Sequence, residues 1–140
     1  MKIRAVTGYA VHSGIRNLFI VQIETDTGLI GLGEGGMSGR EWSMQVMVDH
    51  CAQSLVGKDP RRIEHLWQEC STGVGISKVA TFWARSSPPS TSRWDINVQA
   101  LGVPGYQLLG GACRERVPCF ATPGALTGPE IVDHAQAHVD

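Results

Sequence analysis

The chain has 140 residues, of which 42% are hydrophobic and 18% charged, enough to bury the core of one ordinary globular domain. Its formal net charge of −1 gives no electrostatic basis for binding nucleic acid or an anionic membrane, so we expect neither partner. No apolar run reaches the length of a membrane span and no signal peptide is evident, which predicts a cytoplasmic protein.

The first third of the chain predicts a three-stranded antiparallel sheet. Branched and aromatic residues are frequent in residues 2–12 and 18–25, which is typical of strands. Asp26-Thr27-Gly28 has the composition of a hairpin turn, because Gly accepts the positive φ that a tight turn needs. Residues 29–34 are then expected to form a third strand, antiparallel to the second, so that the three strands make a meander.

Two helices are predicted after a glycine-rich loop at residues 34–39. Apolar side chains at helical spacing indicate the first helix: Met44, Met47, Val48, Cys51 and Leu55. Gly57 is suited to end it. Asp59 is expected to cap the second helix and Pro60 to occupy its first turn, where a missing N–H costs nothing. The buried face of this helix would consist of Ile63, Leu66, Trp67 and Cys70.

The remainder of the sequence predicts short secondary-structure elements. Residues 71–77 are expected to be loose, and residues 96–109 to contain helical pieces, with Pro104 opening a short one that ends at Gly110-Gly111. Residues 117–121 predict a short buried strand and residues 129–139 the opening of a helix. A β-meander followed by helices and a single β-α start is an α+β fold with an appendage.

Two stretches together resemble a known family. The first is Ile-Glu-Thr-Asp-Thr-Gly-Leu-Ile-Gly-Leu-Gly-Glu at residues 23–34, and the second is Trp94-Asp95-Ile96 followed by Ala-Leu-Gly-Val-Pro at 100–104 and Tyr-Gln-Leu-Leu-Gly-Gly at 106–111. They resemble the amino-terminal domain of the enolase superfamily, in its mandelate racemase/muconate-lactonizing branch. The most similar members are acid-sugar dehydratases of the galactonate dehydratase type. Asp-Pro-Arg-Arg-Ile at residues 59–63 also resembles the opening of the family's second helix.

The resemblance implies a division of the chain and of the chemistry. Residues 1–112 would be the capping domain, a three-stranded antiparallel β-meander followed by a helical bundle, and residues 113–140 the start of a TIM-like barrel. In the family, barrel carboxylates hold Mg²⁺ and a base abstracts the proton α to a carboxylate. Those groups would lie beyond Asp140, so we expect a truncated chain that binds no Mg²⁺ and is inactive alone. A homo-oligomer is expected because the face covered by the barrel should be apolar.

The resemblance also implies that two loops of this domain close over an acid-sugar substrate. They correspond to residues 13–17 and 35–40, and the expected substrate-binding residues are Arg16, Asn17, Met37 and Arg40. A guanidinium such as that of Arg16 can pair bidentately with a sugar-acid carboxylate. An exposed turn residue is the equally weighted alternative for Arg16, and Glu34 is expected to tie down the second loop.

Residues 83–93 depart from the family pattern, in which a helix close to Ser-Ala-Ile-Asp-Ile-Ala-Leu precedes the Trp-Asp-Ile motif. Two prolines and four serines in this window oppose a helix. Codon degeneracy allows a shifted reading frame to encode the family's seven residues immediately before Trp94. We hypothesise a local double frame shift, in the gene or in its sequence determination, and independent DNA reads across codons 83–94 test it.

Other readings stay open. The chain could be a stand-alone α+β interaction or dimerisation module, or the product of a damaged gene; DNA past codon 140 separates these from the enzyme. His134 and His138 have the spacing of a zinc pair, but no third ligand is evident, so a solvated helix face is expected. Four widely spaced cysteines without a C-x-x-C pair favour reduced thiols.

Overall fold

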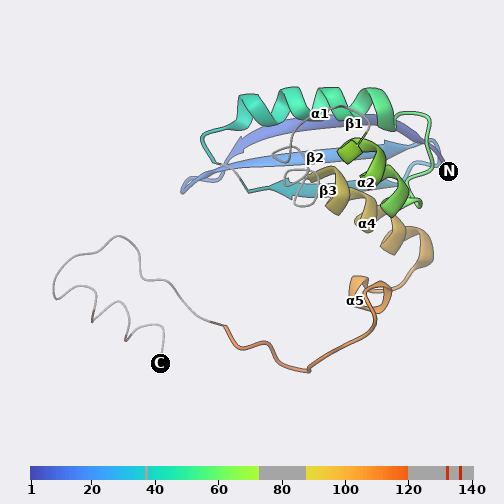
Figure 1. Ribbon diagram of the computed structural model, residues 1–140. Helices are drawn as coiled ribbons and strands as arrows, with labels where there is room; N and C mark the ends of the chain where they lie inside the picture. The colour runs from blue at the N-terminus through green and yellow to red at the C-terminus, as the bar shows by residue number, and fades with distance from the viewer. Residues whose placement is uncertain (37, 73–87, 120–131, 133–135, 137–140) are drawn as a thin grey trace. The chain divides into compact units, whose positions relative to one another are not determined.

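The computed structural model describes residues 1–36, 38–72, 88–119, 132 and 136 (Figure 1). The chain divides into two compact units, Met1–Gly110 and Gly111–Asp140. All the strands and helices with defined bounds belong to the first unit. No helix within the described ranges is long and apolar enough to cross a membrane.

Three strands form an antiparallel sheet in the order β1-β2-β3, as predicted: β1 (Ile3–His12), β2 (Asn17–Thr25) and β3 (Ile30–Gly35). Gly28 has a φ of 86° in the turn after β2, and the Thr25 N–H donates to the Leu29 carbonyl oxygen at 3.0 Å. The expected hairpin chemistry therefore closes the meander. The α+β fold class predicted from the sequence is confirmed.

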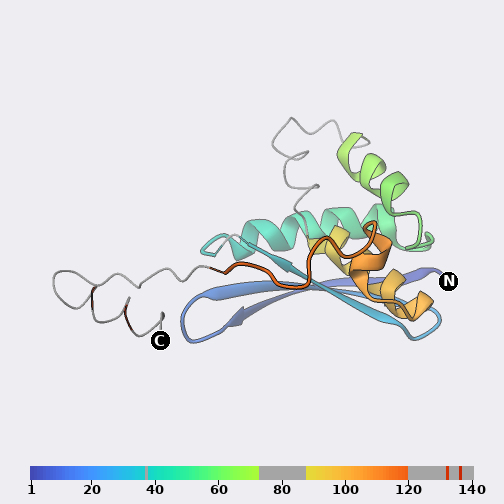
Figure 2. The ribbon, with the colours of Figure 1, turned by 90° about the horizontal axis from the view of Figure 1, so that it is seen from below.

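One face of the sheet carries the core. Strand alternation turns three residues of β2 toward this face, each at most 2% exposed: Phe19, Val21 and Ile23. Helix α1 (Glu41–Leu55) lies along the strands (Figure 2) and buries Met44, Val48 and Leu55 against them. The predicted apolar stripe is confirmed, and Gly57, with a φ of 86°, follows the end of the helix.

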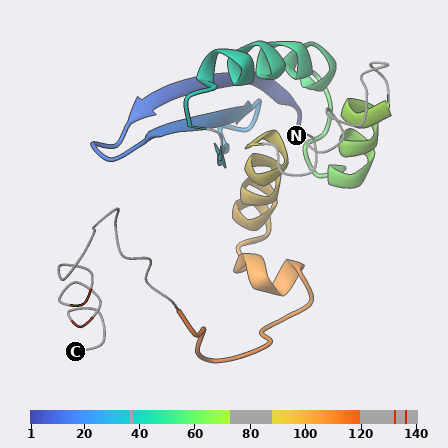
Figure 3. The ribbon, with the colours of Figure 1, turned by 60° about the vertical axis from the view of Figure 1, so that its left-hand side comes forward.

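Helix α4 (Pro88–Leu101) packs on β3 through the Trp-Asp-Ile motif (Figure 3). The Asp95 carboxylate accepts the backbone N–H of Leu32 at 2.9 Å, and Ile96 is fully buried in the core. Gly31 permits this approach, because a Cβ there would lie 2.1 Å from the Ser92 carbonyl oxygen. Asp95 and Ile96 of the motif therefore help to fix α4 against the sheet.

The prediction that residues 83–93 oppose a helix is wrong from Pro88 onward. Pro88 and Pro89 stand in the first turn of α4, where a missing N–H removes no helical hydrogen bond. The Ser92 hydroxyl donates to the Val21 carbonyl oxygen at 2.9 Å, so this buried polar group is satisfied in the core. Residues 83–87 lie outside the described residues.

The predicted start of the second helix is also wrong, since α2 begins at Ile63 (Ile63–Thr72). The Asp59 carboxylate instead accepts the Arg61 backbone N–H at 3.0 Å, and the Asp59 carbonyl oxygen accepts from Arg62. These bonds close a turn before the helix. The Arg61 guanidinium also hydrogen-bonds Asp59, which lowers the pKa of that carboxyl to about 2.

After α2, some of the predicted elements are confirmed and others are not. Thr72 still belongs to α2, inside the stretch expected to be loose, and residues 73–77 lie outside the described residues. Pro104 does open a short helix, α5 (Gly105–Leu108), and Gly110 and Gly111 adopt positive φ after it. Residues 117–119 are exposed and outside any strand, because a lone segment has no neighbour to pair with. Most of residues 120–140, including the histidine pair, are not described.

Candidate functional site

The two loops expected to cover a substrate lie at the same end of the sheet. Residues 13–16 join β1 to β2, and residues 36–40 join β3 to α1. Antiparallel pairing places Phe19 opposite Gly35, so the start of β2 lies beside the end of β3. Loops that are about twenty positions apart in the sequence therefore lie at the same end of the sheet.

An ion pair links the first loop to the end of β3. The Arg16 Nη2 atom donates to Glu34 Oε1 at 3.2 Å, and the two side chains are 63% and 46% exposed. An exposed pair of this kind contributes at most about 1 kcal/mol. Arg16 therefore keeps most of its five N–H donors for another acceptor, and little free energy opposes an exchange of partner.

Asn17 connects the first loop to the start of α1. Its Oδ1 atom lies 2.9 Å from the His12 Nδ1 atom, and Asn17 and Glu41 line the same hollow. The backbone N–H groups of Glu41 and Gly39 and the Asn17 side chain hold the pKa of the Glu41 carboxyl below its ordinary value. Glu41 is therefore a carboxylate at neutral pH, fixed at the loop.

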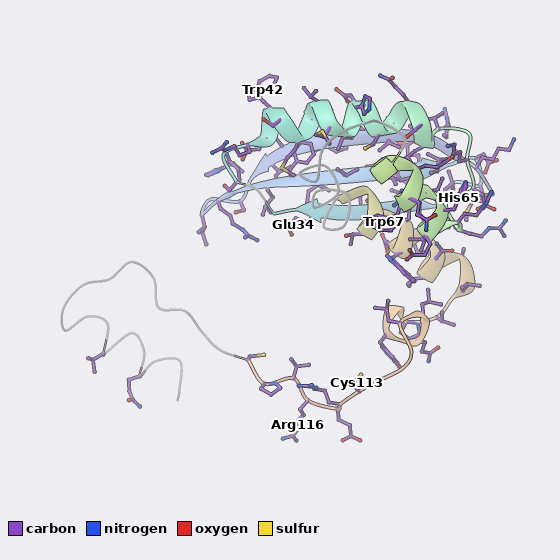
Figure 4. All side chains as sticks on the ribbon, viewed as in Figure 1. Glu34, Trp42, His65, Trp67, Cys113 and Arg116 are labelled. Atoms are coloured by element: carbon purple, nitrogen blue, oxygen red, sulfur yellow. The ribbon has the colours of Figure 1, made fainter. Side chains whose placement is uncertain are left out.

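An open hollow of about 420 Å³ lies at this end of the first unit. Its lining combines apolar and hydrogen-bonding side chains: Ala10, Val11, His12, Asn17, Phe19, Glu41, Trp42 and Gln45. Trp42 is 87% exposed at the first turn of α1 (Figure 4). A lining of this kind can contact the C–H groups of a small polar molecule and can also hydrogen-bond its hydroxyls.

Of the expected substrate residues, Asn17 lines the hollow. Arg16 and Arg40 are adjacent in the sequence to the lining residues Asn17 and Glu41, but they do not line the hollow themselves. Met37 lies outside the described residues. Sequence reasoning missed His12, Glu41 and Trp42. Trp42 carried a usable signal, since it is an aromatic residue outside the apolar stripe of its helix, directly after a glycine-rich loop.

A metal centre is not formed by the part of the chain that the structure describes. Nowhere in that part do three His, Cys, Asp or Glu side chains come together as ligands. At this end, the Glu34 carboxylate is engaged with Arg16 and the Glu41 carboxylate with the Gly39 backbone N–H. The described residues therefore do not fit a Mg²⁺ site.

Comparison with known proteins finds relatives of a single family. The profile of the mandelate racemase / muconate lactonizing enzyme N-terminal domain matches residues 6–110. The D-galactonate dehydratase of Verminephrobacter eiseniae (strain EF01-2) is 37% identical over 140 residues, which are 100% of this chain and 36% of the relative. The chain spans about 35% of the length of the curated relatives it matches.

Solved structures show the same fold. A protein of Mesorhizobium loti, provisionally named a dehydratase, superposes with a TM-score of 0.85 at 32% identity, over 99% of this chain and 38% of its own. An enolase from Pantoea ananatis with bound D-gluconate and Mg superposes with a TM-score of 0.73 at 34% identity, over 81% of this chain and 28% of its own.

Proposed function

Because the chain belongs to the mandelate racemase/muconate lactonizing enzyme family, we propose that it is the substrate-capping domain of an acid-sugar dehydratase, of the galactonate type, that works in the cytoplasm. The supporting observation is that two loops lie at the same end of the sheet as an open hollow with hydrogen-bonding side chains. The magnesium ligands and the acid and base would come from the barrel. There Mg²⁺ stabilises the charge that develops when the proton α to a carboxylate is removed.

Within this proposal the cap contributes specificity. Arg16 exchanges Glu34 for the carboxylate or hydroxyls of the sugar acid, while Asn17 bonds a hydroxyl at the hollow. Arg40 and Met37 belong to the second loop and close over the same substrate. Glu34 then serves to hold Arg16 in place before the substrate arrives, as their ion pair at 3.2 Å suggests.

A chimeric enzyme tests this function. Residues 1–112 would replace the matching segment of the Verminephrobacter eiseniae dehydratase, and turnover of a panel of aldonic acids with Mg²⁺ would be compared with the parent enzyme and with residues 1–140 alone. We expect dehydration by the chimera and none by residues 1–140, since the metal ligands are supplied by the barrel. A folded chimera that turns over no aldonic acid would refute the dehydratase assignment, and turnover by residues 1–140 would refute the capping role.

Arg16→Ala in the chimera is expected to raise KM for the acid sugar more than it lowers kcat. A capping-loop arginine grips the substrate away from the carbon that loses its proton, so its contribution is mainly uniform binding. Loss of a charge-assisted bond of about 1.5–3 kcal/mol corresponds to roughly a ten- to hundredfold fall in kcat/KM.

Two further variants complete the kinetic test. Arg16→Lys should recover only part of the loss, because an ammonium cannot make the paired contact. Arg4→Ala, at an exposed position of β1, is the matched control and should leave both constants unchanged. Unchanged constants in Arg16→Ala would mean that Arg16 is an ordinary exposed turn residue.

A further inference from the structure

Two cysteines join α1 to α2 beside the core. Cys51 and Cys70 are half-buried and pack against the same apolar cluster, which consists of Ile3, Ile23, Leu55, Leu66 and Ile96. Their side chains are close enough for each thiol to shift the pKa of the other. Ser54 reaches both residues, since its Oγ donates to the Cys51 carbonyl oxygen at 2.9 Å and lies 3.9 Å from the Cys70 sulfur.

A third helix adds a cation to this pair. Arg93 of α4 is 1% exposed, and its positive charge lowers the pKa of the Cys70 thiol. Hydrogen bonds from Cys51, Ser54 and Arg93 together lower the pKa of the Cys70 thiol against the opposing effect of burial. The pKa of Cys51 is raised, because its hydrogen bond to Cys70 and its burial both favour the protonated form.

The two sulfurs thus have different chemical roles. A thiolate, not a thiol, is the nucleophile toward peroxides and disulfides, and a neighbouring cation together with hydrogen-bond donors is the environment that makes one. Cys70 has that environment, with the Ser54 hydroxyl 3.9 Å from its sulfur, and Cys51 is the adjacent thiol. A low-pKa cysteine next to a second cysteine is the usual arrangement of a redox-sensing pair.

We propose that Cys70 and Cys51 form a peroxide-reactive dithiol, with Cys70 as the nucleophile and Cys51 as the resolving thiol. The Cys70 thiolate attacks hydrogen peroxide, the O–O bond breaks, and Cys70 becomes a sulfenic acid as hydroxide leaves and takes up a proton. The Cys51 sulfur then attacks the Cys70 sulfur. The S–O bond breaks, the S–S bond forms, and the departing hydroxide leaves as water with the Cys51 proton. Overall, two thiols and one peroxide give one disulfide and two waters.

The disulfide would tie α1 to α2 at the core. It is independent of the loop end of the domain, where the capping function is proposed, since none of its residues lines that hollow. Cys113 and Cys119 are exposed and belong to the second unit, so they are internal controls for unselective oxidation.

Peptide mapping of the 140-residue chain after treatment with hydrogen peroxide tests the proposal. Cleavage after Lys and Arg places Cys51 in residues 41–58 and Cys70 in residues 63–78, while Cys113 and Cys119 fall in residues 94–114 and 117–140. We expect a linked pair of 41–58 with 63–78 that is about 2 Da lighter than the summed peptides and is split by a reductant. Linkage through Cys113 or Cys119, or a Cys51–Cys70 link that appears only in urea, would overturn the proposal.

Variants assign the roles. In Cys51→Ser the sulfenic acid should persist on Cys70 and be trapped by dimedone, whereas in Cys70→Ser no trapping at Cys51 is expected. Arg93→Leu should slow Cys70 oxidation by roughly tenfold at pH 7 and make its rate rise from pH 7 to 8.5, because the thiolate would no longer be stabilised. The Arg4→Leu control should match the parent. Equal rates in the parent and Arg93→Leu, or dimedone adducts on Cys51 instead of Cys70, would contradict the assignment.

Discussion

Gly31→Ala is expected to destabilise the domain by about 3 kcal/mol, at the upper end of the cost of overpacking a core. The added Cβ would lie 2.1 Å from the Ser92 carbonyl oxygen and 2.6 Å from the Ile96 Cγ1 atom. The first of these neighbours is helix backbone, so relief requires α4 to move away from β3. Urea unfolding followed by circular dichroism measures the change in the free energy of unfolding.

Gly36→Ala is the matched control for this substitution. Gly36 lies just beyond the end of β3, has nothing within 4 Å of an added Cβ, and is not among the glycines with positive φ. We expect its free energy of unfolding to stay within about 0.5 kcal/mol of the parent value. Equal stability of Gly31→Ala and the parent would show that α4 does not rest on Gly31 at this distance.

The strands and α1 were predictable because their signals are local. Period-two alternation in residues 18–25 and the 3.6-residue spacing from Met44 to Leu55 each express which face is buried. The hairpin at Gly28 and the helix end at Gly57 depend on a single backbone conformation that glycine adopts readily. Such features need no knowledge of distant contacts.

Helix α4 was not predictable from composition, because contacts with the sheet stabilise it. Its serines and prolines disfavour a helix locally, yet Ser92 donates to Val21 and Asp95 accepts from Leu32, residues more than sixty positions away. The prediction that Asp59 caps the second helix was wrong for the opposite reason. There a local side-chain hydrogen bond to Arg61 competes with the helical cap that Asp-Pro usually indicates.

The candidate site also has a part that could be predicted from the sequence and a part that could not. The resemblance indicated the two loops and their arginines, whereas the hollow depends on residues brought together from β1, β2 and α1. His12 stands alone in the sequence, and only the β1-β2 register places it opposite Asn17. The contacts that shape the hollow are therefore a property of strand pairing, which sequence periodicity alone does not specify.

Arg93→Leu is expected to stabilise the domain, because burying a guanidinium costs desolvation free energy that an apolar side chain of similar size avoids; replacing whole buried ion pairs by apolar residues stabilises proteins by up to about 4 kcal/mol. Arg93 is 1% exposed, and its burial lowers the pKa of its guanidinium. Urea unfolding at pH 7 should show a higher midpoint with an unchanged slope.

Arg4→Leu is the control for this variant, because Arg4 is exposed on β1 and its replacement should change stability by no more than about 0.5 kcal/mol. A lower midpoint for Arg93→Leu would mean that the guanidinium stabilises the core. The expected gain bears on the frame-shift hypothesis, since the shifted frame places Ala and Leu at positions 92 and 93. Both positions are almost completely buried, at 0% and 1% exposure, which is the environment that Ala and Leu favour. A stabilising Arg93→Leu would therefore indicate that the core of this domain is built for an aliphatic side chain at position 93.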